Sequence, residues 1–167
     1  MAKADTIILN KTEIAHKLKR MAYQIYEANV GEDEVIIAGI KENGFILAQK
    51  LKVVVEQISP LKVTICEVIL NKKQPLSAIT TSLSPEQYTN ASLVLVDDVL
   101  HSGTTLIYAV KHFLEVPLKQ FKTAVLVDRN HKKYPVKADY KGISLSTSIS
   151  ENVSVIFEKN NDRAILE

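Results

Sequence analysis

The fold is decided by one stretch of the sequence, Leu93-Val94-Leu95-Val96-Asp97-Asp98-Val99-Leu100-His101-Ser102-Gly103-Thr104-Thr105. Its first four residues are aliphatic, and no polar residue alternates with them. A short continuous apolar run is typical of a strand that is covered on both faces, as in a parallel sheet. We therefore expect Asp97 and Asp98 at the carboxyl end of a buried strand, where open α/β sheets bind their ligands.

The turn that follows the two acids has a different chemistry. The residues from His101 to Thr105 combine one glycine with three hydroxyl side chains, and we expect a helix to begin here. The start of a helix presents unpaired N–H groups and a partial positive charge. Gly103 lets the main chain approach a ligand closely, and the hydroxyls of Ser102, Thr104 and Thr105 add donors. This combination suits a phosphate monoester.

The two acids must serve another part of the ligand, because carboxylates repel phosphate. They suit ribose hydroxyls or a developing positive charge, so the whole segment fits a phosphorylated sugar with vicinal hydroxyls. Each half alone also fits a structural role, since Ser and Thr often cap helices and strands often end in Asp. The ordered combination is much rarer and favours the functional interpretation.

Length and composition limit the class of protein. A chain of 167 residues with one cysteine, Cys66, is expected to form a single domain (1–167) without an intrachain disulfide, in a reducing compartment. There is no signal-peptide pattern and no apolar run long enough to span a bilayer, which predicts a cytoplasmic protein without membrane contact. A net charge of +2 does not by itself argue for a nucleic-acid partner.

The remaining sequence alternates helical and extended patterns. A capping box at Asn10–Glu13 precedes an amphipathic helix that ends near residue 29. Further segments are expected as a strand at 34–38, a helix at 45–58, and strands at 61–70, 121–128, 153–157 and 164–166. This order predicts an α/β fold of three layers, with helices on both sides of a mainly parallel sheet. Residues 71–92 lack periodicity, which suggests a flexible arm or lid.

With these residues in view, the segment 93–105 resembles the motif of type I phosphoribosyltransferases that binds 5-phosphoribosyl 1-diphosphate (PRPP). Other segments resemble the PyrR family, bacterial pyrimidine-operon regulators that also have uracil phosphoribosyltransferase activity. These segments are Gly39–Ala48, Val125–His131, Pro135–Gly142, and Thr147-Ser148 followed by Glu151. The similarity runs from about residue 10 to the end, and it implies the type I fold with a small hood region.

The resemblance implies transfer of ribose 5-phosphate from PRPP to a nitrogen of a pyrimidine or related base, with release of pyrophosphate. Asp97 and Asp98 would hold the ribose hydroxyls and stabilise the positive charge of the transition state, and His101–Thr105 would hold the 5′-phosphate. The loop of Lys41, Glu42, Asn43 and Gly44 would contact pyrophosphate. Mg²⁺ would be held mainly through the substrate, so no protein metal ligand is expected.

The resemblance also implies partners and a base site. Asp128 and Arg129 would flank the base, although Asp128 also fits the cap of a turn and Arg129 a solvated ion pair. Homodimers or larger assemblies are expected. A nucleoside monophosphate is expected to bind as well as PRPP and the free base. RNA is a possible further partner that the charge of the chain does not support.

Three departures from the PyrR pattern bear on activity. The early loop reads Lys41-Glu42-Asn43-Gly44 where that family typically has Lys-Thr-Arg-Gly, residues 66–82 lack its Tyr-Arg-Asp-Asp segment, and Ile149 replaces an arginine. Each lost charge-assisted contact to phosphate costs ~1.5–3 kcal/mol. Lys72 and Lys73 either replace the lost cations or lie in a solvated turn. We favour an active enzyme. The alternative is a PRPP- or nucleotide-sensing regulator with weakened catalysis, for which RNA is the further partner to test.

Overall fold

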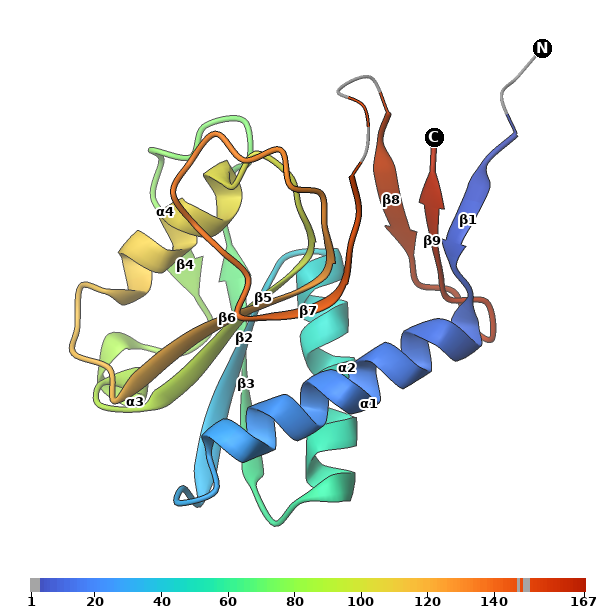
Figure 1. Ribbon diagram of the computed structural model, residues 1–167. Coiled ribbons are helices and arrows are strands. Elements are labelled where there is room, and N and C mark those ends of the chain that lie inside the picture. Colours follow the sequence, from blue (N-terminus) through green and yellow to red (C-terminus); the bar gives the residue numbers. More distant parts are fainter. Residues whose placement is uncertain (1–3, 147, 149–150) are drawn as a thin grey trace.

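The computed structural model describes residues 4–146, 148 and 151–167. The apolar runs form a six-stranded sheet in the order β4-β3-β2-β5-β6-β7 (Figure 1). Its strands are β2 (Glu34–Ile40), β3 (Lys62–Ile69), β4 (Thr80–Thr81), β5 (Ser92–Leu100), β6 (Gln120–Asp128) and β7 (Tyr140–Ser144). Only the short β4 pairs antiparallel to its neighbour in this sheet, so the predicted mainly parallel sheet is confirmed.

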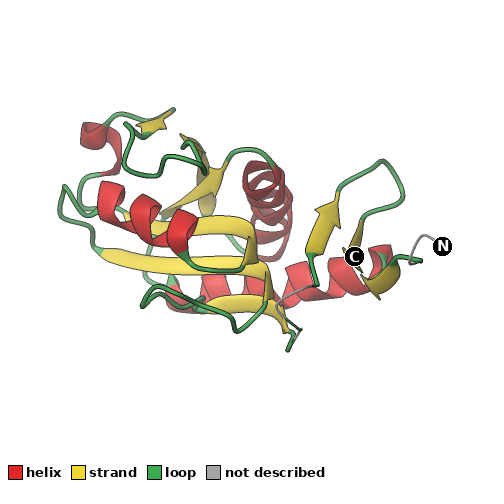
Figure 2. Ribbon diagram, turned by 90° about the horizontal axis from the view of Figure 1, so that it is seen from above, coloured by secondary structure: helices red, strands yellow, loops and turns green. Residues whose placement is uncertain are grey.

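Helices cover both faces of this sheet, as Figure 2 shows. Helices α1 (Lys11–Ala28) and α2 (Asn43–Ile58) pack with Val94 and Val96 of β5, whereas α4 (Thr104–Phe113) packs with Leu93 and Leu95. Neighbouring residues of a strand point to opposite faces, which explains why the run Leu93–Val96 contains no polar residue. The three-layer α/β architecture predicted from the sequence is thus confirmed.

Helix α1 begins where the sequence predicts. The side chain of Asn10 accepts a hydrogen bond from the Glu13 amide at 2.9 Å, and Glu13 Oε1 accepts one from the Asn10 amide at 3.3 Å. This reciprocal pair is a capping box. Among the residues that the structure describes, no helix is long and apolar enough to cross a membrane.

A second, smaller sheet stands beside the main one and forms a hood. It contains β1 (Thr6–Leu9), β9 (Arg163–Leu166) and β8 (Val153–Ile156) in that order, all antiparallel. Figure 1 shows the first and last strands of the chain, β1 and β9, side by side in this sheet, which lies beyond the start of α1. The sequence predicted two of these strands, at 153–157 and 164–166, but not β1.

The segment 71–92, predicted as an arm without periodicity, contains two short elements, β4 and the helix α3 (Pro85–Tyr88). Tyr88 is buried, and its ring meets the ring of Phe113 edge to face with centroids 5.0 Å apart. The second half of the segment is therefore packed against the protein. Residues 71–78 contain no helix or strand, and a lid in this part stays a prediction.

The connections from β2 and β5 run to opposite sides of the sheet. From β2 the chain crosses by α2 to β3, whereas from β5 it crosses by α4 to β6, and β2 and β5 are themselves neighbours. Ligands of open α/β sheets bind where the strand order reverses in this way, beyond the carboxyl ends of the strands. The loops Lys41–Gly44 and His101–Thr105 both begin at this point.

Candidate active site

The acid pair lies inside β5 rather than after it, because the strand pairs with β6 as far as Leu100 opposite Asp128. Asp97 is buried, and its Oδ1 accepts a hydrogen bond from the Asp98 amide at 2.9 Å. Asp98 is half-buried, and its Oδ1 accepts one from the Val99 amide at 2.9 Å. These bonds fix both carboxylates at the switch point of the sheet.

The two acids differ in their electrostatic surroundings. Burial raises the pKa of the Asp97 carboxyl well above its usual value, and the negative charge of Asp98 raises it further, while Lys72 opposes the shift. Asp97 therefore holds a proton more tightly than an exposed aspartate does. A positive charge or a hydroxyl donor placed beside it would favour its ionised form.

The turn after β5 forms a cradle of main-chain amides. Gly103 caps α4 in the left-handed conformation, with φ of 86°, and a Cβ at this position would lie 2.6 Å from Val136 Cγ1. The amide of Thr104 lies 3.3 Å from Ser102 Oγ. Within the described ranges, the amides of Ser102, Gly103 and Thr105 have no hydrogen-bond acceptor. Free amides at the start of a helix attract an anion.

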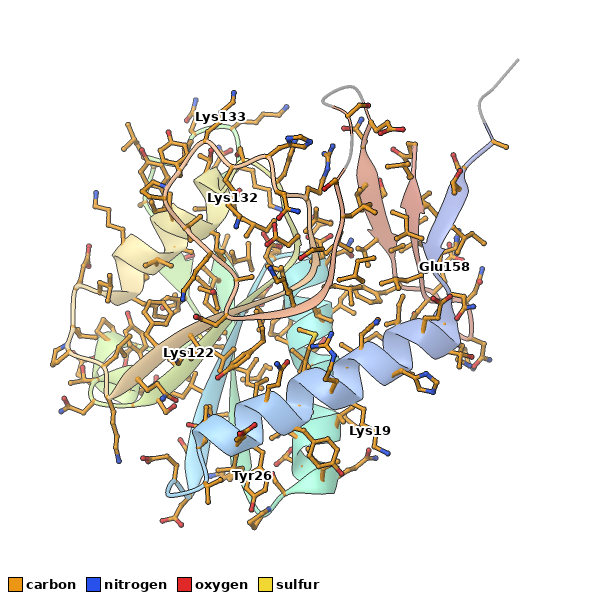
Figure 3. The ribbon with its side chains drawn as sticks, viewed as in Figure 1. Lys19, Tyr26, Lys122, Lys132, Lys133 and Glu158 are labelled. Carbon is orange, nitrogen blue, oxygen red and sulfur yellow. The ribbon has the colours of Figure 1, made fainter. Side chains whose placement is uncertain are left out.

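Cations surround the cradle. Burial lowers the pKa of His101, and the positive charges of Arg129, His131 and Lys133 lower it further. Lys133 and its neighbour Lys132 extend from the loop that follows β6 (Figure 3). The imidazole of His101 thus tends to be neutral, while Arg129 and Lys133 bring positive charge close to it.

The acids and the cradle line one cleft of about 430 Å³. Its walls are Asp97–Gly103, Thr105 and Leu106 on one side, with Lys72, Val125, Arg129, Asn152–Ser154 and Glu167 around them. Thr104 lies away from the cleft surface, and its Oγ1 lies 2.9 Å from Ser102 Oγ. The structure therefore brings together every predicted ribose and phosphate residue except Thr104, which supports its neighbour instead.

A second cleft of about 480 Å³ adjoins the first and contains the predicted pyrophosphate loop. It is lined by Lys41, Glu42, Asn43, Ile69, Leu70, Lys72 and Asp98. Lys72 and Asp98 line both clefts, so the two halves of the site meet at these side chains. Gly44 is buried behind the loop, where a Cβ would lie 2.8 Å from the Val96 carbonyl oxygen.

The side chain of Asn43 lines this second cleft but is already hydrogen-bonded to the protein. Its Nδ2 donates to Asp98 Oδ2 at 3.2 Å and to the carbonyl of Val155 in β8 at 2.8 Å. One amide group thereby joins the pyrophosphate loop, the acid pair and the hood. The Lys41–Glu42 peptide bond beside it is cis.

The two predicted base-side residues have different positions. Arg129 is 2% exposed and lines the first cleft, and its guanidinium donates to the carbonyl oxygens of Ser148 and Glu151. It is buried rather than solvated, and both of these carbonyl groups belong to residues that precede β8. Thr147, which the resemblance places beside the base, and the substitution at Ile149 lie outside the described residues.

Asp128 is buried but lies off the cleft surface. Its Oδ1 accepts a hydrogen bond from the amide of Asn130 at 3.1 Å, and Asn130 has a left-handed backbone conformation. Asp128 therefore caps a turn. The ammonium groups of Lys132 and Lys141 lie 3.5 Å from its Oδ2 as ion pairs, without the geometry of a hydrogen bond. The structure therefore places Arg129, but not Asp128, on the surface of the cleft.

Sequence reasoning missed the hood wall and left the role of Lys72 open. Asn152, Val153 and Ser154 also line the first cleft, and β8 alternates too briefly to reveal which face turns inward. No local signal in the sequence identifies this wall, because it depends on the pairing of the two ends of the chain.

Comparison with known proteins agrees with this geometry. The protein-family model described as a phosphoribosyl transferase domain matches residues 5–158 of this chain. The chain belongs to the phosphoribosyltransferase family. A relative named bifunctional protein PyrR, from Brevibacillus brevis, is 34% identical over 158 residues, covering 90% of this chain and 88% of the relative. Another PyrR, from Staphylococcus saprophyticus, is 30% identical over 168 residues, covering 96% of each.

Solved structures show the same fold. The hypoxanthine phosphoribosyltransferase of Trypanosoma cruzi superposes with a TM-score of 0.77 at 17% identity, covering 96% of each chain. A hypoxanthine-guanine phosphoribosyltransferase from Bacillus anthracis gives 0.73 at 21% identity, covering 87% of this chain and 85% of that one. The type I phosphoribosyltransferase fold predicted from the sequence is confirmed.

Proposed function

We propose that this protein transfers ribose 5-phosphate from PRPP to a ring nitrogen of a pyrimidine or related base and releases pyrophosphate. The observation that carries the proposal is the amide cradle at Ser102–Thr105, which shares one cleft with Asp97 and Asp98. A phosphorylated ribose satisfies both halves, since its phosphate meets the amides and its hydroxyls meet the carboxylates. The PyrR relatives favour a pyrimidine, and uracil is the first base to test.

The reaction exchanges one bond at the anomeric carbon for another. The bond from that carbon to the diphosphate oxygen breaks with its electron pair passing to the diphosphate, the base nitrogen bonds to the carbon, and its proton passes to solvent. Positive charge develops on the ribose before the new bond is complete. Asp97 and Asp98 lie where they stabilise that charge, and the cradle holds the phosphate end still. Catalysis of this kind is mainly positioning and electrostatics.

The base is proposed to lie between Arg129 and the hood wall. Arg129 holds the carbonyls of Ser148 and Glu151, and Asn152–Ser154 continue from this segment along the cleft. Main-chain groups and the Ser154 hydroxyl can pair with the edge of a base. Asp128 acts behind this surface by fixing the turn that carries Arg129.

Mg²⁺ is proposed as a companion of PRPP. Its hard-oxygen preference fits the carboxylate of Asp98, which faces both clefts. Among the residues that the structure describes, no group of three or more His, Cys, Asp or Glu side chains could hold a metal by itself. We propose that substrate oxygens hold most of the ion's coordination sites, and that it would supply charge neutralisation at the diphosphate.

The direct test is release of pyrophosphate from PRPP and Mg²⁺ in the presence of uracil, compared with cytosine, hypoxanthine and no base. We expect base-dependent release that Asp98→Asn abolishes while the melting temperature is kept. If no base gives release above the blank and neither PRPP nor uridine 5′-monophosphate (UMP) binds in a titration, the proposed function is wrong.

A second candidate is a sensor of PRPP or nucleotides whose turnover is weak. It is favoured by the second cleft, where Glu42 adds negative charge and Asn43 is engaged with the protein. Binding of UMP without turnover on any base would support it. If RNA is a partner, its affinity must fall steeply with salt. Assembly into dimers or larger species and a cytoplasmic location are proposed with either function, and light scattering tests the assembly.

A further inference from the structure

We propose that Lys72, on the loop after β3, supplies the positive charge that faces the diphosphate of PRPP, and that Asn43 serves as a positioning residue for Asp98. The inference rests on the proposed function and assigns a residue to the less obvious half of its site. It explains how a cleft without an arginine in its pyrophosphate loop can accept a diphosphate.

The first observation is that Asn43 is already engaged. Its amide donates to Asp98 Oδ2 and to the carbonyl of Val155, and both acceptors belong to the protein. To donate to a ligand in the second cleft, the Asn43 amide would have to give up one of these two hydrogen bonds. Its bonds fix the carboxylate of Asp98 relative to the hood, which is a positioning role.

The second observation is the place of Lys72. It is exposed, yet it lines both clefts, and Asp98 is the only other described residue that does so. Within the described part of the chain, its ammonium makes no hydrogen bond or ion pair. Its charge also reaches the acid pair, since Lys72 opposes the rise of the pKa of Asp97. Lys72 is therefore a cation directed at the junction where ribose meets diphosphate.

The third observation is that hydrogen bonds in the loop fix the backbone position of Lys72. The amide of Gln74 donates to the Asn71 carbonyl at 3.1 Å, and the amide of Lys73 donates to Asn71 Oδ1 at 3.0 Å. Lys72 thus occupies a defined corner of a turn. Lys73, the next residue, carries the same charge but lines neither cleft.

The charges of the second cleft make Lys72 necessary. The cleft contains two cations, Lys41 and Lys72, against the carboxylates of Glu42 and Asp98. Without Lys72 one cation faces two carboxylates, so the side chains of this cleft would carry net negative charge and Mg²⁺ alone would have to offset the charge of the diphosphate. During the transfer the diphosphate gains the electron pair of the broken bond, so a cation at this point stabilises the departing group.

The experiment compares Lys72→Met with Lys73→Met by isothermal titration of PRPP–Mg²⁺, inorganic pyrophosphate–Mg²⁺ and UMP. We expect Lys72→Met to weaken PRPP and pyrophosphate roughly ten- to hundred-fold, as loss of a charge-assisted contact does. UMP carries no diphosphate, so its affinity stays within about twofold. Lys73→Met should leave all three ligands unchanged, and Lys72→Arg should restore most of the PRPP affinity.

Each outcome decides the inference. Equal losses for Lys72→Met and Lys73→Met, or an unchanged PRPP affinity for Lys72→Met, overturn the role of Lys72 while the proposed function stands. Loss of UMP together with PRPP in Lys72→Met would mean a structural defect rather than a diphosphate contact, and would overturn it too. Failure of the unsubstituted protein to bind PRPP contradicts the proposed function itself, and this inference with it.

Discussion

The two halves of the proposed active site offer different groups to an anion. In the phosphate half, the donors are main-chain amides fixed by Gly103 and the start of α4. In the diphosphate half, the charges belong to side chains of opposite sign, Lys41, Glu42 and Lys72, on two separate loops. A main-chain cradle depends on little beyond the backbone path, whereas the other half changes with every substitution.

Gly103→Ala is expected to break the phosphate half most severely. The left-handed conformation costs an ordinary residue ~1–2 kcal/mol, and the new Cβ would lie 2.6 Å from Val136 Cγ1, so the loop must move. We expect the affinity for UMP and for PRPP–Mg²⁺ to fall by more than about a hundred-fold, because two or more charge-assisted hydrogen bonds to the phosphate are lost. Isothermal titration measures both ligands.

The matched control for that substitution is Gly31→Ala, because nothing lies within 4 Å of a Cβ at Gly31. It should leave both affinities unchanged. Retained binding of UMP in Gly103→Ala would contradict the role of the cradle.

Asp98→Asn removes the carboxylate that both halves share. We expect UMP and PRPP–Mg²⁺ to weaken together by roughly ten- to hundred-fold, since the ribose hydroxyls lose a charged acceptor. The Asn43 amide loses its carboxylate partner as well. Asp33→Asn, an exposed acid far along the chain, is the control in the same titration. A variant that loses PRPP but keeps UMP would place Asp98 in the diphosphate half alone.

Asp97→Asn should show that this acid is held at the expense of stability. The raised pKa of Asp97 means that its contribution to stability is full below the ordinary pKa of an aspartate and is lost as pH rises through the raised value. The amide that replaces the carboxyl has no charge to bury, so this loss disappears. We therefore expect the free energy of unfolding of the variant to be about 1 kcal/mol higher near neutral pH. Urea unfolding at several pH values measures it, and a benefit that does not shrink in acid would be inconsistent with the shifted pKa.

Glu42→Gln should sharpen the comparison by improving the diphosphate half. Removing the negative charge from the second cleft should raise PRPP–Mg²⁺ affinity by about two- to fivefold, the size of an exposed charge effect. UMP affinity should not change, because the phosphate half does not contain Glu42. Glu86→Gln, on the far helix α3, is the control. An equal gain for UMP would indicate a general field effect instead.

The same contrast explains what the sequence predicts. The apolar run before Asp97 and the glycine among hydroxyls after it have a local physical meaning, so the buried strand, the helix start and the cradle follow from the order of residues. The bonds of Asn43 do not, because Val155 comes from a distant strand and its position depends on the pairing of the hood. Likewise β7, with Gly142 against the Leu126 carbonyl, is set by contact with β6 rather than by its own pattern.

The central claim is tested most directly by the backbone amide signals of Ser102, Gly103 and Thr105 in an NMR titration with UMP and with uridine. We predict large downfield proton shifts of these three amides with UMP and none with uridine, since only the phosphate supplies an acceptor. Unchanged amide signals at saturating UMP, or equal shifts with uridine, would contradict the account.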